Sequence, residues 1–150
     1  MLTIIRTDSA DPHFQDLVRL LDADLAIRDG DDHAFYAQFN TTSKIRHALV
    51  GYVEDLPVAC GAIRPFDDQT VEVKRMYTLP DHRKKGIASA MLAELEQWAA
   101  ELGMKRCVLE TGKNQPEALA MYDRSGYQVI PNYGQYAGVS NSVCFEKSLS

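Results

Sequence analysis

Residues 80–89, PDHRKKGIAS, lie between an apolar segment typical of a strand and the clearest helical pattern in the chain. Three cations, Arg83, Lys84 and Lys85, come just before Gly86 and the expected start of that helix. A cation at a helix N-terminus opposes the helix dipole and destabilises by roughly 0.3–1 kcal/mol. The three charges are therefore either solvated surface residues or part of a site for a negative ligand.

The segments around this stretch predict helices and strands in alternation. Apolar residues repeat at helical spacing from Ala88 to Leu102, and Gly103 ends that helix. Asp11 as N-cap and Pro12 at the first position predict another helix, over about 12–28. Shorter helices are expected over 33–39 and 116–126. Apolar runs predict strands over 2–7, 45–55, 56–66, 69–79, 106–111, 127–130 and 142–149.

The order of these elements predicts how the strands pair. A strand, a long helix and a strand in succession, over 69–111, predict a parallel crossover unit. The closely spaced strands before it predict antiparallel hairpins, one with a tight turn near Asp55. We therefore expect fold class α/β (α+β): a mixed, mostly antiparallel sheet of six to seven strands with helices on both faces.

Composition and charge narrow the class of protein. The 150 residues, 45% hydrophobic and 25% charged, suit one globular domain. A net charge of -5 argues against general nucleic-acid binding, which needs a basic face. The chain shows neither a secretory signal pattern nor an apolar run of membrane-spanning length, so we expect a cytoplasmic protein without membrane association.

The three cysteines, Cys60, Cys107 and Cys144, each lie in a short apolar stretch typical of a strand. Buried free thiols in a reducing compartment explain them better than a disulfide. No CxxC pair is present, so we expect neither a zinc site nor a redox pair.

The basic turn before the long helix has the chemistry of a phosphate cradle. The first amides of a helix lack partners inside the helix and, with the dipole, attract anions. Gly86 lets the backbone approach a ligand closely, and Arg and Lys add charge-assisted hydrogen bonds. The chain contains neither GxxxxGK[ST] nor GxGxxG, so the P-loop and dinucleotide fingerprints are excluded.

The pattern Arg83-x-x-Gly86-x-Ala88 resembles the [Q/R]-x-x-G-x-[G/A] segment of the GNAT superfamily of N-acetyltransferases. Residues 109–130 are similar to the next segment of that family, which ends in Tyr-x-x-x-Gly-[Phe/Tyr], here Tyr122, Gly126 and Tyr127. The expected element order agrees with the family over nearly the whole chain. The sequence is thus identified as a small, bacterial-type member with one catalytic domain over residues 2–149.

The resemblance implies acetyl-CoA as the cofactor and an N-acetyltransferase as the activity. In the family, the turn binds the pyrophosphate, and the preceding strand bulges away from its neighbour and binds the pantetheine arm. Many members also carry an asparagine seven residues before the tyrosine. In this sequence that position is Gln115, and Asn114 is adjacent. Either residue, or neither of them, takes the place of the family's asparagine. The cofactor-binding residues implied are Met76, Tyr77, Thr78, Arg83, Lys84, Lys85, Gly86, Ile87, Ala88, Ser89, Asn114 and Gln115.

Two residues are predicted to be catalytic. Tyr122 is the candidate acid for the leaving thiolate; alternatively it only packs. Glu72 is the candidate base; alternatively it forms a surface ion pair with Lys74. Glu110 is the second candidate base, and a water chain would replace both. Strand alternation places Glu72, Lys74 and Met76 on one face and Val71, Val73, Arg75 and Tyr77 on the other, unless a bulge exchanges the faces.

The acceptor is expected to be a primary amine of a small molecule or a peptide. Segments 28–40 and 131–138 are expected to contact it, and the oligomeric state stays open between a monomer and a homodimer. Two other classes of protein compete with the enzyme: a non-catalytic acyl-CoA-binding module and a module that docks a phosphorylated partner. The candidate acceptor-contacting residues are Asp29, Asp31, Asp32, His33, Tyr36, Phe39, Tyr133 and Tyr136.

Overall fold

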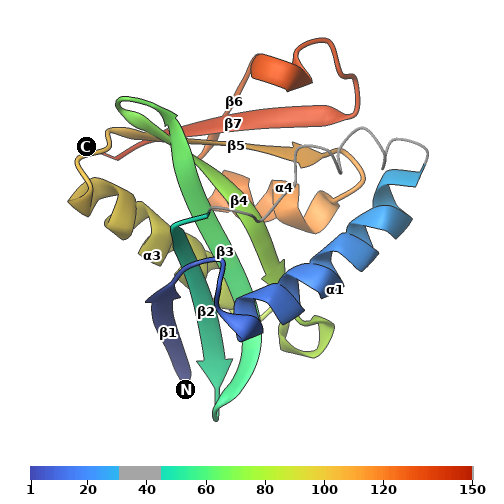
Figure 1. Cartoon of the computed structure of the whole chain (residues 1–150). Helices are drawn as coiled ribbons and strands as arrows, with labels where there is room; N and C mark the ends of the chain where they lie inside the picture. Colours follow the sequence, from blue (N-terminus) through green and yellow to red (C-terminus); the bar gives the residue numbers. More distant parts are fainter. Residues whose placement is uncertain (31–44, 150) are drawn as a thin grey trace.

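The computed structural model describes residues 1–30 and 45–149, and it contains helices and strands in nearly the predicted order (Figure 1). The helix expected over 33–39 lies outside the described residues. The strands are β1 (Leu2–Thr7), β2 (His47–Val53), β3 (Leu56–Asp67), β4 (Thr70–Thr78), β5 (Arg106–Gly112), β6 (Gln128–Ile130) and β7 (Ser142–Ser148). The helices are α1 (Pro12–Asp29), α3 (Ile87–Glu101) and α4 (Pro116–Arg124), with short 3-10 turns η2 (Pro80–His82) and η3 (Gly134–Tyr136).

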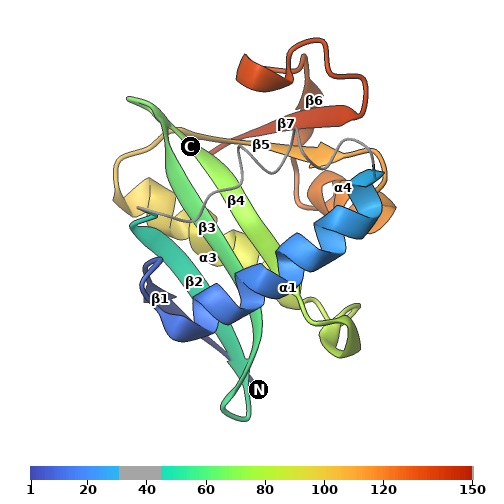
Figure 2. The same cartoon turned by 45° about the vertical axis from the view of Figure 1, so that its right-hand side comes forward.

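The seven strands form a single sheet in the order β1-β2-β3-β4-β5-β7-β6. β4 and β5 are parallel, as the crossover through α3 requires, and the other neighbours are antiparallel. Helix α1 covers one face of the sheet, and α3 and α4 cover the other (Figure 2). The predicted fold class, a mixed and mostly antiparallel sheet between helices, is confirmed.

Each face of the sheet has its own hydrophobic core. Met91 and Leu95 of α3 are fully buried in the main core, and Phe14 of α1 is fully buried in the second core, on the opposite face. Burying a side chain of this size stabilises the fold by about 1.5–3 kcal/mol. Helix α1 begins as predicted, because the Asp11 carboxylate accepts hydrogen bonds from the amides of residues 13 and 14.

The three cysteines are buried free thiols, as predicted. None of the described helices is both long and apolar enough to cross a membrane.

Strand β4 contains a bulge that decides which side chains face the functional site. Opposite β4, Ala62 pairs with Lys74 and Cys60 pairs with Tyr77, so β4 carries one extra residue at this point. Arg75 lies in the bulge with φ +60°, in the left-handed region. The bulge that the family resemblance implied is therefore present.

The bulge overturns the simple alternation predicted for this strand. Val71 and Val73 belong to the main core, and beyond the bulge Met76 packs against that core while Tyr77 packs against the second one. Arg75 points to α1, where it pairs with Asp22. Met76 thus faces the side that Arg75 and Tyr77 were expected to share, because the extra residue exchanges the two faces.

The parallel strands β4 and β5 stay together only at their beginnings. Their pairing covers Thr70, Val71 and Glu72 of β4 against Arg106, Cys107 and Val108 of β5. Both strands then continue, β4 to Thr78 and β5 to Gly112, without further pairing to each other. This split opens a space in the middle of the sheet.

Candidate active site

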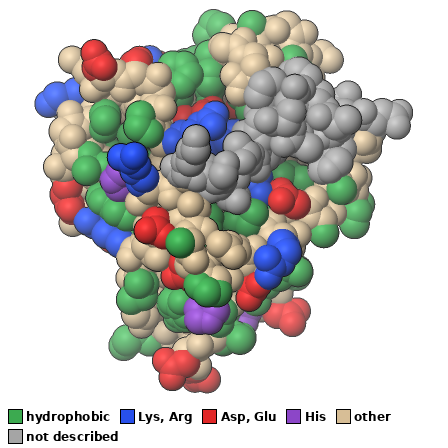
Figure 3. Space-filling view, in the orientation of Figure 1, with side chains coloured by type: hydrophobic (Ala, Val, Ile, Leu, Met, Phe, Trp, Pro, Cys, Tyr) green, Lys and Arg blue, Asp and Glu red, His purple; other side chains and the backbone are tan. Residues whose placement is uncertain are grey.

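The split between β4 and β5 forms one end of a cavity of about 760 Å³. Its walls come from the second half of α1, from β4 and β5, from the turn before α3 and from α4. On this face of the molecule, acidic and basic side chains lie close together near the centre (Figure 3). Ten of the predicted cofactor-binding residues line the cavity: Met76, Tyr77, Thr78, Arg83, Lys84, Gly86, Ile87, Ala88, Ser89 and Gln115. Tyr122 and Glu110 line it as well.

The turn before α3 presents free amides to this cavity. Lys84 has φ +64° and Gly86 has φ +80°, and Gly86 is the N-cap of α3. Within the described chain, the amides of Ile87, Ala88 and Ser89 donate to no backbone carbonyl. Left-handed residues followed by unpaired helix amides form a concave anion site, so this donor set fits the phosphates of a coenzyme A group.

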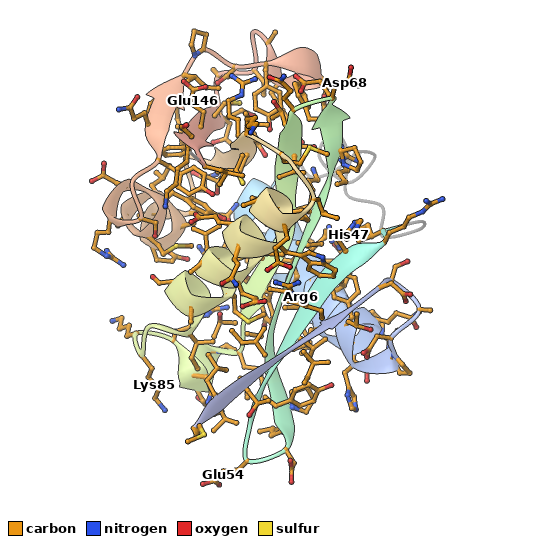
Figure 4. The ribbon with its side chains drawn as sticks, turned by 90° about the vertical axis from the view of Figure 1, so that its left-hand side faces the viewer. Arg6, His47, Glu54, Asp68, Lys85 and Glu146 are labelled. Carbon is orange, nitrogen blue, oxygen red and sulfur yellow. The ribbon has the colours of Figure 1, made fainter. Side chains whose placement is uncertain are left out.

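The three cations of the turn are not equivalent. The Arg83 Nε donates to the Thr78 carbonyl at 2.9 Å, and the guanidinium lies 5.5 Å from the Tyr77 ring centre. Arg83 is thereby fixed against the end of β4. Lys84 lines the cavity, whereas Lys85 does not line it and projects away from the turn into solvent (Figure 4).

Tyr122 lies on the buried face of α4 and is only 6% exposed. Burial raises the pKa of its phenol above the ordinary value, and the charge of Glu110 raises the pKa further. Among the described residues, no group forms a hydrogen bond with the Tyr122 hydroxyl. The phenol therefore keeps its proton and is free to donate it to a group inside the cavity.

The two candidate bases occupy different positions. Glu72 is buried and does not line the cavity. One of its oxygens accepts from Arg64 Nε at 3.0 Å and Nη2 at 2.9 Å, and the other accepts from the Tyr133 hydroxyl at 2.7 Å. The partner of Glu72 is thus Arg64, and a surface ion pair with Lys74 is not what the structure shows.

Glu110 lies at the cavity wall, on the part of β5 that has separated from β4. One of its oxygens accepts a hydrogen bond from the Ser142 hydroxyl at 2.8 Å, and Ser142 is buried on the neighbouring strand β7. A carboxylate held in this way presents its other oxygen in a fixed direction.

Two cations of the cavity wall, Lys74 and Arg75, were not predicted from the sequence. Burial lowers the pKa of Lys74, although the charges of Glu72 and Glu110 oppose the shift. Its ammonium donates to the Tyr136 hydroxyl at 3.3 Å. The signal in the sequence was a pair of adjacent charges in an otherwise apolar strand, where alternation allows only one of them to face solvent.

The loop before α4 distinguishes Gln115 from Asn114. Gln115 lines the cavity, whereas the Asn114 amide donates to the Arg28 carbonyl at 3.1 Å. Arg28 also pairs with Asp24 at 3.2 Å and with Glu117. Asn114 thus ties the end of α1 to the start of α4 beside the cavity.

Of the residues expected to contact the acceptor, the structure describes a few. Tyr133 binds Glu72, and Tyr136 is 1% exposed and binds Lys74, so both attach the loop of η3 to β4. Asp29 is the last residue of α1. The others, Asp31, Asp32, His33, Tyr36 and Phe39, lie outside the described residues.

Comparisons with known proteins agree with this architecture. Residues 13–127 match the family model described as acetyltransferase (GNAT) family. The uncharacterised N-acetyltransferase YsnE of Bacillus subtilis is 33% identical over 92 residues, 60% of this chain and 61% of the relative. The chain thus spans less than two thirds of that curated relative.

Two solved structures share the fold along the whole chain. A putative acyl-CoA N-acyltransferase from Klebsiella pneumoniae has a TM-score of 0.84 and 30% identity, covering 100% of this chain and 99% of that one. The PaiA N-acetyltransferase of Thermoplasma acidophilum, solved in complex with coenzyme A, has a TM-score of 0.72 and 14% identity, covering 99% of each chain. The second likeness concerns the fold alone.

Proposed function

This chain belongs to the GNAT family of acetyltransferases, and from that premise we propose that it transfers an acetyl group from acetyl-CoA to a primary amine of a small molecule or peptide. One observation carries the proposal. The split between β4 and β5 brings the free amides of the α3 turn and the unpaired hydroxyl of Tyr122 to the walls of the same cavity. Residues 2–149 would form the catalytic domain.

Acetyl-CoA, when bound, supplies the acetyl thioester that the amine attacks. The amides of Ile87, Ala88 and Ser89 and the side chains of Arg83 and Lys84 would hold its pyrophosphate, because they combine unpaired donors with positive charge. The end of β4, at Met76, Tyr77 and Thr78, would bind the pantetheine arm. Gln115 rather than Asn114 would assist, since only Gln115 of the two lines the cavity.

The amine must lose a proton before it attacks, and the cavity wall offers Glu110 for that step. Its carboxylate would take the proton from the acceptor ammonium, directly or through one water. Glu72 is the alternative base. Its two oxygens already carry three hydrogen bonds from Arg64 and Tyr133, so we assign it to holding the η3 loop against β4.

The leaving sulfur needs a hydrogen-bond donor, and we assign this role to Tyr122, which lines the cavity. Because the raised pKa keeps the phenol protonated, its O–H stabilises the negative charge that develops on the sulfur. The thioester oxygen would accept a hydrogen bond from the backbone N–H of Met76 or Tyr77, next to the bulge. Attack would be direct, with amine and acetyl-CoA bound together.

Thiol release, followed with DTNB in the presence of acetyl-CoA and a panel of amines, tests the proposal. We expect release that depends on one class of amine, together with the acetylated amine in the mass spectrum. Binding of acetyl-CoA without turnover of any amine would contradict the enzyme and favour an acyl-CoA-binding module. Binding of a phosphopeptide but not of CoA would contradict the cofactor site itself.

A further inference from the structure

Arg75 occupies an unusual position for a charged residue. It lies in the bulge of β4 with φ +60°, where a non-glycine residue is strained, and its side chain is only 1% exposed. It belongs to the cavity wall next to Lys74. A buried guanidinium needs hydrogen-bond acceptors, because an unpaired buried donor is costly.

The guanidinium of Arg75 has fewer hydrogen-bond acceptors than it has buried N–H groups. Its Nη2 donates to Asp22 at 2.6 Å, but its Nε and Nη1 are buried and have no partner. In the part of the chain that the structure describes, three buried side-chain nitrogen or oxygen atoms lack a partner, and two of them belong to this one side chain. The buried carboxylate of Glu72 has a better-paired arginine, because Arg64 donates both its Nε and its Nη2 to it.

Asp22 is a weak partner for a buried cation. Its side chain is 51% exposed, so water competes for the carboxylate and the pair adds little stability. A second carboxylate that replaces Asp22 on Nη2 would also reach Nη1, because these two nitrogens form one fork of the guanidinium. Asp22 would then turn into solvent at small cost.

We propose that Arg75 is the carboxylate-binding residue of the acceptor site, so that the acceptor is an amine that also carries a carboxylate, such as an amino acid. This inference rests on the proposed function. The ammonium of such an acceptor would lie toward Glu110, and its carboxylate toward Arg75 with Lys74 beside it. Cations on β4 and an anion on β5 match the two ends of a zwitterion.

The first test needs only the unchanged chain. An amino acid and its carboxamide are compared as acceptors at equal concentrations of the unprotonated amine. We expect kcat/KM to be about 10- to 100-fold higher for the acid, the range for a hydrogen bond to a charged group. Equal rates for the two acceptors would overturn the inference while leaving the acetyltransferase intact. Turnover of neither, nor of any other amine, would instead mean that the proposed function fails.

Substitutions test whether Arg75 causes the preference for the amino acid over its carboxamide. Arg75→Met is expected to remove it by lowering kcat/KM for the acid much more than for the carboxamide, so that the ratio of the two falls toward one, and Arg75→Lys is expected to keep part of it. Arg19→Met, at an exposed arginine of α1, is the matched control and is expected to keep the full preference. CoA binding by calorimetry verifies folding of each variant. If Arg75→Met does not fold, Arg75→Lys decides, and an unchanged acid preference in a folded variant would contradict the assignment.

Discussion

Gly61 of β3 lies directly against the sulfur of Met76 of β4: a Cβ atom added at Gly61 would lie 2.6 Å from it and 3.1 Å from a methyl group of Leu95. The missing side chain leaves the room that the bulged strand needs. Gly61 thereby links the main core to the strand that we expect to bind the pantetheine arm.

Gly61→Ala should destabilise the protein and weaken acetyl-CoA binding. Overpacking of this kind costs about 1–3 kcal/mol, and the Met76 side chain, which lines the cavity, would have to move. Urea unfolding and calorimetry with CoA measure the two effects. In the double variant Gly61→Ala, Met76→Ala, we expect part of the stability to return. Strict additivity of the two changes would show that the contact does not matter.

The anion site at the turn predicts a ranking of three variants. Arg83→Ala should weaken CoA binding more than Lys85→Ala, because Arg83 lines the cavity and Lys85 does not. Gly86→Val should weaken it most, since valine at φ +80° is strained and moves the amides. The charge effects should shrink at high salt. CoA affinity that is indifferent to all three changes would refute the cradle.

The two carboxylates can be separated by conservative changes. Glu110→Gln should lower kcat by about 10²–10⁴-fold with little change in CoA affinity, as expected for a general base. Glu72→Gln should mainly lower the free energy of unfolding, because it leaves the half-exposed Arg64 without its charged partner. The reverse pattern, with Glu72→Gln inactive but stable, would make Glu72 the base.

We expect the three cysteines of the native protein to contribute no signal to the thiol-release assay. Burial raises the pKa of Cys107 and Cys144 to about 11 and that of Cys60 to about 12. At neutral pH hardly any thiolate is present, so the native protein should not react with DTNB. After unfolding in guanidinium, three thiols should react. Rapid reaction of a native thiol would place that cysteine at the surface.

Much of the fold could be predicted because periodicity is a local property. The helix ended by Gly103 and the strands on either side of it follow from apolar spacing. The split sheet and the turn with unpaired amides before α3 follow from the motif around Gly86 and its family resemblance.

Which side chains form the wall of the cavity could not be predicted, because this depends on contacts between residues that are far apart in the sequence. The bulge at Arg75 appears only in the register against β3, where Gly61 lies against the Met76 sulfur. From the sequence, Glu72 was the first candidate base and Glu110 the second. They differ because Tyr133, 61 residues beyond Glu72, reaches one of them.

The proposed role of Tyr122 as the hydrogen-bond donor to the leaving sulfur can be measured with Tyr127 as the matched control. The two rings lie 5.8 Å apart, but only the Tyr127 hydroxyl has a partner, Glu96 at 3.0 Å. Steady-state kcat is to be measured for Tyr122→Phe and Tyr127→Phe with saturating acetyl-CoA and the best amine. We expect kcat to fall by about 10²–10⁴-fold for Tyr122→Phe with unchanged stability, and Tyr127→Phe to lose about 0.5–1.5 kcal/mol of stability with kcat retained. Full activity of a folded Tyr122→Phe variant would show that Tyr122 does not stabilise the leaving sulfur.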